Sequence, residues 1–452
     1  MVKQEDSELD YIPTTEATIA ARRSHRLLRR IESADGGLFT ADAWWRSGYV
    51  ELAALTLISV LNLFLLSPLV GTASPSNTYS GPLIPFLASI VATISRIPFS
   101  YAAQMVNVFF FLLLPVSLYI LIKLLTNRIL TALFAVLIAT LPLTLFLQGR
   151  VEAGLLGGDS SHVASLGLMP LALFCLIAFL RRGGMKNLVI ASALSAAIIL
   201  ISPSGAISYF LLAIFATFSE ALLGGSRIKI LRFASLFLLV GALTSFWYNP
   251  SFTFWLIFGP LGDGLRTGIV DLIPLSLFII PVLGTFGFLL FDRKPNLQAV
   301  FLASFWTIGF LIIDCISSGG FPPSGTSRYL PELGLTLAFL LGLGITYFID
   351  SMKQSKITRI PQLNRPAFSN PLITLVLGLL VAGSIILRKD ISSGLYSSNK
   401  LLDNVDKSTL WVLRDNFTGT SALVGYTITG VTLLVICWAY IKRRVWIPEQ
   451  EQ

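Results

Sequence analysis

The chain has 452 residues, of which 54% are apolar and 13% are charged, and its formal net charge is +9. Because a soluble domain carries roughly 25% charged residues, this composition excludes an ordinary water-soluble protein. Apolar runs of about 18 or more residues recur along the chain and indicate an integral membrane protein. The basic residues lie in short clusters between these runs, as topology signals do, so no nucleic-acid partner is expected.

The first segment, residues 1–45, is a polar tail that is acidic over "KQEDSELD" and basic over "ARRSHRLLRR". Its basic part is either a helix lying on anionic lipid or a solvated stretch whose arginines set the topology. Residues 46–445 are expected to form one all-α transmembrane module. We predict twelve spans in it, at 49–67, 101–122, 129–147, 163–180, 187–201, 206–223, 231–248, 270–291, 298–316, 329–349, 371–387 and 422–441.

One further apolar run, at 81–100, is broken by prolines and is predicted to be a helix that lies along the membrane surface or re-enters it. Basic residues concentrate in the tail and in the loops that follow even-numbered spans. The positive-inside rule therefore predicts that both termini are cytoplasmic. It also predicts five outer loops, at 67–100, 148–162, 249–269, 317–328 and 388–421. The module is expected in the cytoplasmic membrane, with its functional face extracytoplasmic.

The outer stretch "GGDSSH" places Asp159 three residues before His162, one of two histidines in the chain. In one interpretation Asp159 only caps the following helix. In the other, Asp159 and His162 face one cavity, where they bind a divalent cation (Mg or Mn) or a substrate phosphate, or move a proton. Glu152 and Arg150 share this loop and would enlarge such a site.

Three other outer positions carry candidate chemistry. Arg328 either snorkels to the interface or binds a lipid phosphate, and Glu332 lies one turn further on, where it could pair with Arg328. Arg266 follows the aromatic stretch "TSFWYNPSFTFWLIFGPLGDGLR", which is either an interfacial belt or a groove for sugar or lipid. Asn416 lies in "NFT", a short match to an N-glycosylation site.

Several cofactor classes are not expected. A di-haem protein needs several membrane-buried histidines, and only His162 lies near a span. The sequence has neither a P-loop nor a dinucleotide fingerprint, so no nucleotide is expected. A transporter is the weakest of the functional hypotheses, because proton-coupled carriers usually need ionisable residues near the centres of their spans.

The stretches "LLGGDSSHVASLGLMPLALFCLIAFLRR", "LTSFWYNPSF" and "SRYLPELGLTLAFLLGLGI" together resemble the GT-C superfamily of polytopic membrane glycosyltransferases, in particular its prokaryotic branch. The resemblance covers about 150–350 and extends weakly to 406–419. It implies a many-helix module that takes a sugar from a polyprenyl-phosphate donor at the outer face. Matched by position, the second-loop acid falls on Asp159, with His162 beside it, and the phosphate-binding arginine falls on Arg328.

The first outer loop departs from the family pattern, because no Asp or Glu occurs between Glu51 and Glu152. The large outer domain that often follows the membrane part is not expected either, because the outer loop at 388–421 is short. Two hypotheses therefore remain open. The chain is a lipid-linked sugar transferase with Asp159, His162, Glu152 and Arg328 at its site, or it is a catalytically inactive relative that anchors or assembles the subunits of an extracytoplasmic complex.

Overall fold

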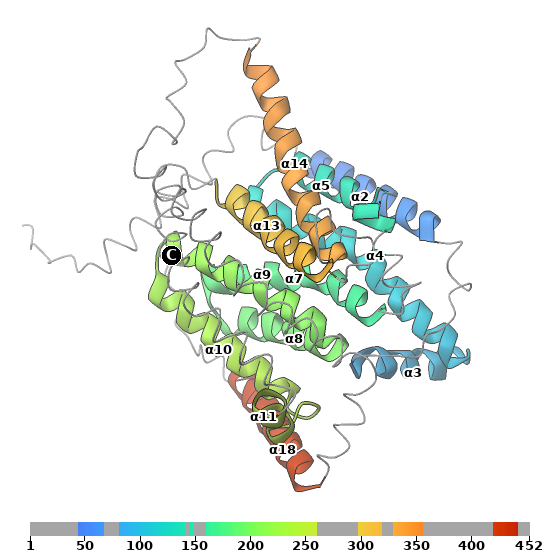
Figure 1. The fold of residues 1–452 in the computed structure, drawn as a ribbon, viewed down its shortest axis with the longest axis vertical. Coiled ribbons are helices and arrows are strands. Elements are labelled where there is room, and N and C mark those ends of the chain that lie inside the picture. Colours follow the sequence, from blue (N-terminus) through green and yellow to red (C-terminus); the bar gives the residue numbers. More distant parts are fainter. Residues whose placement is uncertain are drawn as a thin grey trace, which may run out of the picture.

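A computed structural model describes residues 44–66, 81–141, 144–148, 150, 160–259, 297–318, 329–355 and 419–441. Within these ranges all regular secondary structure is helical (Figure 1). The helices are α2 Trp44–Leu66, α3 Leu83–Ser95, α4 Phe99–Thr126, α5 Ile129–Ala139, η3 Thr144–Gln148, α7 Ser160–Arg182, α8 Met185–Ile201, α9 Pro203–Leu222, α10 Ser226–Thr244, α11 Pro250–Phe258, α13 Gln298–Ser318, α14 Leu330–Ser355 and α18 Thr420–Ile441.

Five of the described helices are long and apolar enough to cross a membrane: α4, α7, α9, α14 and α18. Shorter apolar stretches lie in α2, α3, α5, α8 and α13. The chain is therefore membrane-embedded in character, as its composition predicts. Helices occur at every predicted span that falls within the described residues, whereas the predicted spans 270–291 and 371–387 lie outside them.

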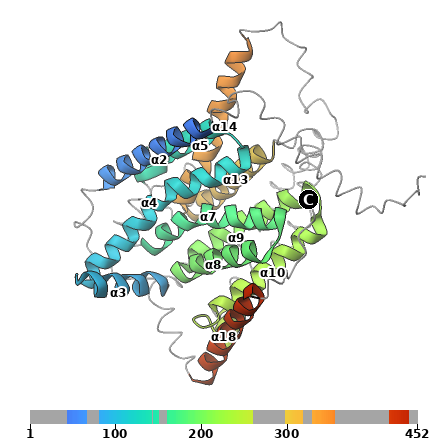
Figure 2. The same ribbon diagram turned by 180° about the vertical axis from the view of Figure 1, so that it is seen from behind.

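The centre of the bundle is a run of antiparallel helices, α7 to α10, joined by very short connections (Figures 1 and 2). Gly183 and Gly184 link α7 to α8 with φ values of 72° and 84°, a region that glycine enters without steric cost. Ser202 alone separates α8 from α9, and its hydroxyl caps α9 by accepting a hydrogen bond from the Gly205 backbone N–H. The starts of α7 and α9 and the ends of α8 and α10 therefore lie at the same end of the bundle.

Small residues allow the helices to approach one another closely. A Cβ atom at Gly167 of α7 would lie 2.2 Å from the backbone oxygen of Phe110 in α4. Ser117 of α4 donates a hydrogen bond of 2.8 Å to the backbone oxygen of Gly167 in the same contact. In lipid, where no hydrophobic driving force draws helices together, close packing of this kind supplies much of the association energy.

The predicted span 129–147 is not one continuous helix. Helix α5 ends at Ala139, and η3 follows with non-helical dihedral angles at Phe146 (φ −115°, ψ −106°). The sequence places Pro142 at this interruption, where its missing N–H cannot continue a helical hydrogen-bond ladder.

The proline-broken run at 81–100 forms the separate helix α3, as expected. It ends at Ser95; the next residue, Arg96, has a φ of 54°, and Pro98 precedes α4. Figures 1 and 2 show α3 lying across the first turns of α4.

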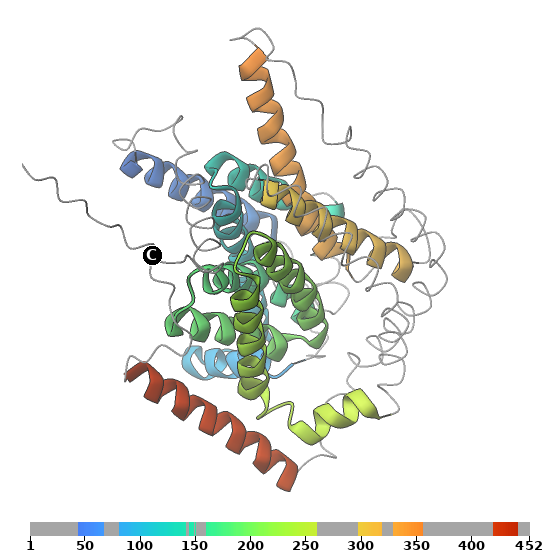
Figure 3. The same ribbon diagram turned by 90° about the vertical axis from the view of Figure 1, so that its left-hand side faces the viewer.

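The last described helix, α18, lies at the edge of the bundle against α10 and α11 (Figure 3). Thr429 of α18 donates to the backbone oxygen of Ala242 at 2.9 Å and accepts from the backbone N–H of Phe246 at 3.0 Å. Ser421 donates to the side-chain oxygen of Asn249, the N-cap of α11, at 2.9 Å. Three hydrogen bonds through two residues of α18, Ser421 and Thr429, thus fix this helix to a segment far away in the sequence.

Candidate functional site

The site centres on His162 in the first turn of α7, whose side chain is completely buried. Its Nε2 atom lies 2.8 Å from Oε1 of Glu332, which is buried in the first turn of α14. The possible pairing of Glu332 with Arg328 involves a residue outside the described ranges. Within those ranges Glu332 lies against His162, the histidine that the sequence singles out.

Serines from the start of α9 complete the surroundings of this pair. Ser204 Oγ lies 3.1 Å from His162 Nδ1, and Ser202 Oγ lies 2.8 Å from Ser204 Oγ. Ser208 donates a hydrogen bond of 2.7 Å to Glu332 Oε1. In the tautomer that carries its proton on Nε2, this nitrogen faces the Glu332 carboxylate, an acceptor, and Nδ1 accepts a hydrogen bond from the Ser204 hydroxyl.

Three helix N-termini converge here, since His162, Ser204 and Glu332 each lie in the first turn of α7, α9 or α14. The exposed N–H groups and the dipole of a helix make its N-terminus favourable for negative charge. This end of the bundle therefore stabilises the buried Glu332 carboxylate. The ring of Tyr329 meets His162 edge-on, with centroids 6.2 Å apart and an interplanar angle of 85°.

A second carboxylate, Asp314 of α13, is buried beside this group. Asp314 accepts a hydrogen bond from the backbone N–H of Tyr329 and interacts electrostatically with Glu332. Two acids and one imidazole from three helices thus share one end of the bundle. In the part of the chain that the structure describes, no three His, Cys, Asp or Glu side chains are grouped as a set of metal ligands.

Arg150, which the sequence placed in the same loop as Asp159, makes different contacts. Its side chain is buried and donates hydrogen bonds to the backbone oxygens of Ala139 at the end of α5 and Phe146 in η3. Burial lowers the pKa of Arg150 to about 10, so the guanidinium remains charged at neutral pH. Arg150 therefore holds the break after α5 and makes no hydrogen bond to His162 or Glu332.

The remaining predicted site residues lie outside the described residues: Asp159, Glu152, Arg328, Arg266 and Asn416. Of the aromatic stretch, Tyr248, Phe252 and Trp255 are described and form a stack at the start of α11, with successive centroids 6.4 Å apart.

Glu332, Ser204, Ser208 and Asp314 are the participants that sequence reasoning did not connect with His162. The sequence "ISPSGAIS" could have indicated the serines, because it places polar residues at the start of an apolar helix. In this group the imidazole of His162 is the candidate base, and it lies between the carboxylate of Glu332 and the hydroxyl of Ser204. The helix N-termini around it favour negative charge.

Comparison of the chain with protein-family models, with curated proteins and with solved structures yields no significant match.

Proposed function

We propose that the chain is a GT-C-like integral membrane protein that transfers a sugar from a polyprenyl-phosphate donor at the outer face of the cytoplasmic membrane. The observation that carries this proposal is the contact between His162 and Glu332, 2.8 Å apart at the converging starts of α7, α9 and α14. Ionisable groups are costly inside a membrane bundle, and those that occur there commonly serve function.

In the proposed mechanism His162 is the general base. The Glu332 carboxylate beside Nε2 orients the ring, and Nδ1, which contacts the Ser204 hydroxyl, is the atom that would receive a proton from the acceptor hydroxyl. Ser204 Oγ, 3.1 Å from Nδ1, marks the distance at which such a hydroxyl would bind. The helix N-termini stabilise the phosphate that leaves when the sugar is transferred.

Sidedness follows from the distribution of charge. Arg181, Arg182 and Lys186 lie where α7 ends and α8 begins, at the end of the bundle opposite His162. By the positive-inside rule that end faces the cytoplasm, so the His162 end faces outward. This assignment belongs to a twelve-span topology in which both termini are cytoplasmic.

The proposal gives roles to the residues outside the described ranges as well. Asp159 and Glu152 supply the carboxylates expected of the second outer loop. A divalent metal at Asp159 would need His162 as a ligand in place of its role as the base, so the two roles are alternatives for His162. Arg328 and Arg266 bind the donor phosphate, because a guanidinium matches phosphate geometry.

The test measures sugar transfer in membranes that contain the full-length protein, supplied with radiolabelled polyprenyl-phosphate sugars. We expect His162→Gln and Glu332→Gln each to lower turnover by about 100-fold, the usual contribution of a general base and its partner. Tyr209→Phe is the matched control, because Tyr209 is buried within α9 but hydrogen-bonds to Ser195 rather than to the site.

The transferase proposal is rejected if both site variants retain wild-type turnover while remaining folded. Folding is followed by size-exclusion chromatography and thermal unfolding in detergent. If the wild-type protein transfers no sugar from any donor in the panel, the proposal is rejected for that donor class.

A second function, that of a catalytically inactive anchor or assembly subunit, is favoured by a different observation. His162 and Glu332 are both fully buried, and no acid precedes Glu152 in the outer loops. Purification in mild detergent separates the two functions. A stoichiometric extracytoplasmic partner, together with unchanged partner binding in His162→Gln, supports the subunit. Bound polyprenyl phosphate supports the transferase.

A further inference from the structure

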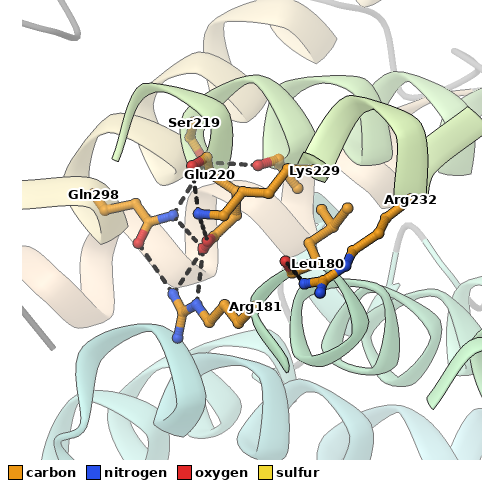
Figure 4. Close-up of polar contacts among 8 residues, drawn as sticks. Leu180, Arg181, Ser219, Glu220, Lys229, Arg232 and Gln298 are labelled. Carbon is orange, nitrogen blue, oxygen red and sulfur yellow. Dashed lines mark hydrogen bonds and ion pairs between the residues drawn. The ribbon is translucent and has the colours of Figure 1, made fainter. Parts of the chain in front are cut away.

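The end of the bundle opposite His162 holds a second polar group, which we term the Glu220 cluster: Arg181, Ser219, Glu220, Lys229 and Gln298 (Figure 4). Glu220 is buried near the end of α9. Its Oε1 accepts hydrogen bonds from Arg181 at 2.9 and 2.8 Å and from Gln298 at 2.7 Å. Lys229 lies 3.1 Å from Oε2 and donates to the Glu220 backbone oxygen at 2.7 Å. One carboxylate thus joins α7, α9, α10 and α13.

Positive charge exceeds negative charge around this cluster. Glu220 faces two cations, Arg181 and Lys229, and can neutralise only one of them. Three further cations, Arg182, Lys186 and Arg227, are exposed at the same end, and none of them forms an ion pair in the described part of the chain. The surface around the cluster is therefore suited to an anionic ligand.

Arg181 is positioned to contact that ligand. Its Nε and one terminal nitrogen bind Glu220, and the same terminal nitrogen donates to Gln298 Oε1 at 3.1 Å. Figure 4 shows the other terminal nitrogen directed away from Glu220, and the side chain is 25% exposed. Two fixed partners thus hold the guanidinium in place while one donor edge remains open, a geometry that suits phosphate oxygens.

Apolar side chains lie next to these cations. On α10 the exposed residues Ile230 and Leu231 follow Lys229 directly, and Leu238 continues the exposed face two turns on, with 74% of its surface accessible. A free phosphate ion would gain nothing from this apolar face, whereas the acyl chains of a lipid would cover it. A basic group at the end of an apolar helix face is the arrangement that recognises an anionic lipid.

We propose that the Glu220 cluster binds the phosphate headgroup of an anionic membrane lipid, with Arg181 as the principal phosphate ligand and the exposed face of α10 as the acyl-chain surface. This inference does not depend on the proposed transferase function, because it concerns the opposite end of the bundle. Glu220 and Gln298 act as positioning residues for Arg181.

Native mass spectrometry of the full-length protein in neutral detergent tests the proposal. Phosphatidylglycerol and phosphatidylcholine are titrated separately, and inorganic phosphate is added as a competitor. We expect phosphatidylglycerol to bind at least about tenfold more tightly than phosphatidylcholine, and an equal concentration of inorganic phosphate not to displace it. Equal binding of the two lipids overturns the proposal. Displacement by inorganic phosphate overturns the lipid assignment in favour of a free-anion site.

Arg181→Gln is compared with Arg182→Gln, which removes the same charge from the adjacent residue without breaking a contact to Glu220. We expect the first variant to lower phosphatidylglycerol affinity by about tenfold and the second by less than about threefold. Equal losses would indicate general surface charge and overturn the role of Arg181. If Arg181→Gln does not fold, Arg181→Lys replaces it. That variant keeps the charge but loses the planar fork, so unchanged lipid affinity would then refute the proposal.

Discussion

Replacing Gly167 with alanine tests the packing on which the bundle depends. A Cβ atom at this position would lie 2.2 Å from the Phe110 backbone oxygen and 3.0 Å from its carbonyl carbon. Both atoms belong to the α4 backbone and cannot move away by a change of rotamer. Because ordinary van der Waals contact begins near 3.4 Å, α4 and α7 must separate by about 1 Å.

The expected cost has two parts. Overpacking a close helix contact costs about 1–3 kcal/mol. Separation also weakens the 2.8 Å hydrogen bond from Ser117 to the Gly167 oxygen, which contributes about 1 kcal/mol. Alanine recovers about 0.5–1 kcal/mol of helix propensity. The net expectation is a loss of about 2 kcal/mol in the free energy of unfolding.

Gly241→Ala is the matched control, because Gly241 also lies within a helix but a Cβ atom there meets nothing within 4 Å. This control is expected to leave the protein unchanged or slightly stabilised. Both variants are compared with wild type by thermal and denaturant unfolding in the same detergent. If Gly167→Ala is as stable as Gly241→Ala, the close approach of α4 to α7 does not exist as described.

Substitutions at three other contacts are assessed by the same unfolding measurements. Glu220→Gln should cost about 3–5 kcal/mol, because Arg181 and Lys229 lose their buried counter-charge, whereas Ser219→Ala should cost only about 1 kcal/mol. Thr429→Val should cost about 1–2 kcal/mol and increase proteolysis near α18, since both of its contacts to the α10 end are lost; unchanged proteolysis would contradict the docking. Asn249→Ala should cost about 1 kcal/mol and Asn249→Asp much less, because aspartate retains the cap on the Phe252 N–H; equal losses would contradict this.

The positions of the helices could be predicted from hydropathy, because lipid requires long apolar segments with internal hydrogen bonds. The break after α5 could have been predicted from Pro142, but the apolar run continues past it and conceals the interruption. The non-helical dihedral angles of Phe146 in η3 could not be predicted, because they depend on the packing of Arg150 and α14 against that turn.

The candidate site was predicted only in part. His162 stood out because histidine is scarce in this chain, but its partner could not be read from spacing. The local rule for helices pairs Glu332 with a residue three or four positions away. The observed pair joins α7 to α14, and only the three-dimensional arrangement of their starts brings the two side chains within 2.8 Å.

The attachment of α18 has a consequence for the order of assembly during biosynthesis. The hydrogen bond from Thr429 to Ala242 joins residues separated by 187 positions. When α10 is synthesised, α18 has not yet been made, so the Ala242 oxygen and the Phe246 N–H still lack their contacts with Thr429. Only after α18 has been synthesised can Gly425 pack against Ser245, where a Cβ atom would lie 2.2 Å from the Ser245 oxygen, so this contact forms late in assembly.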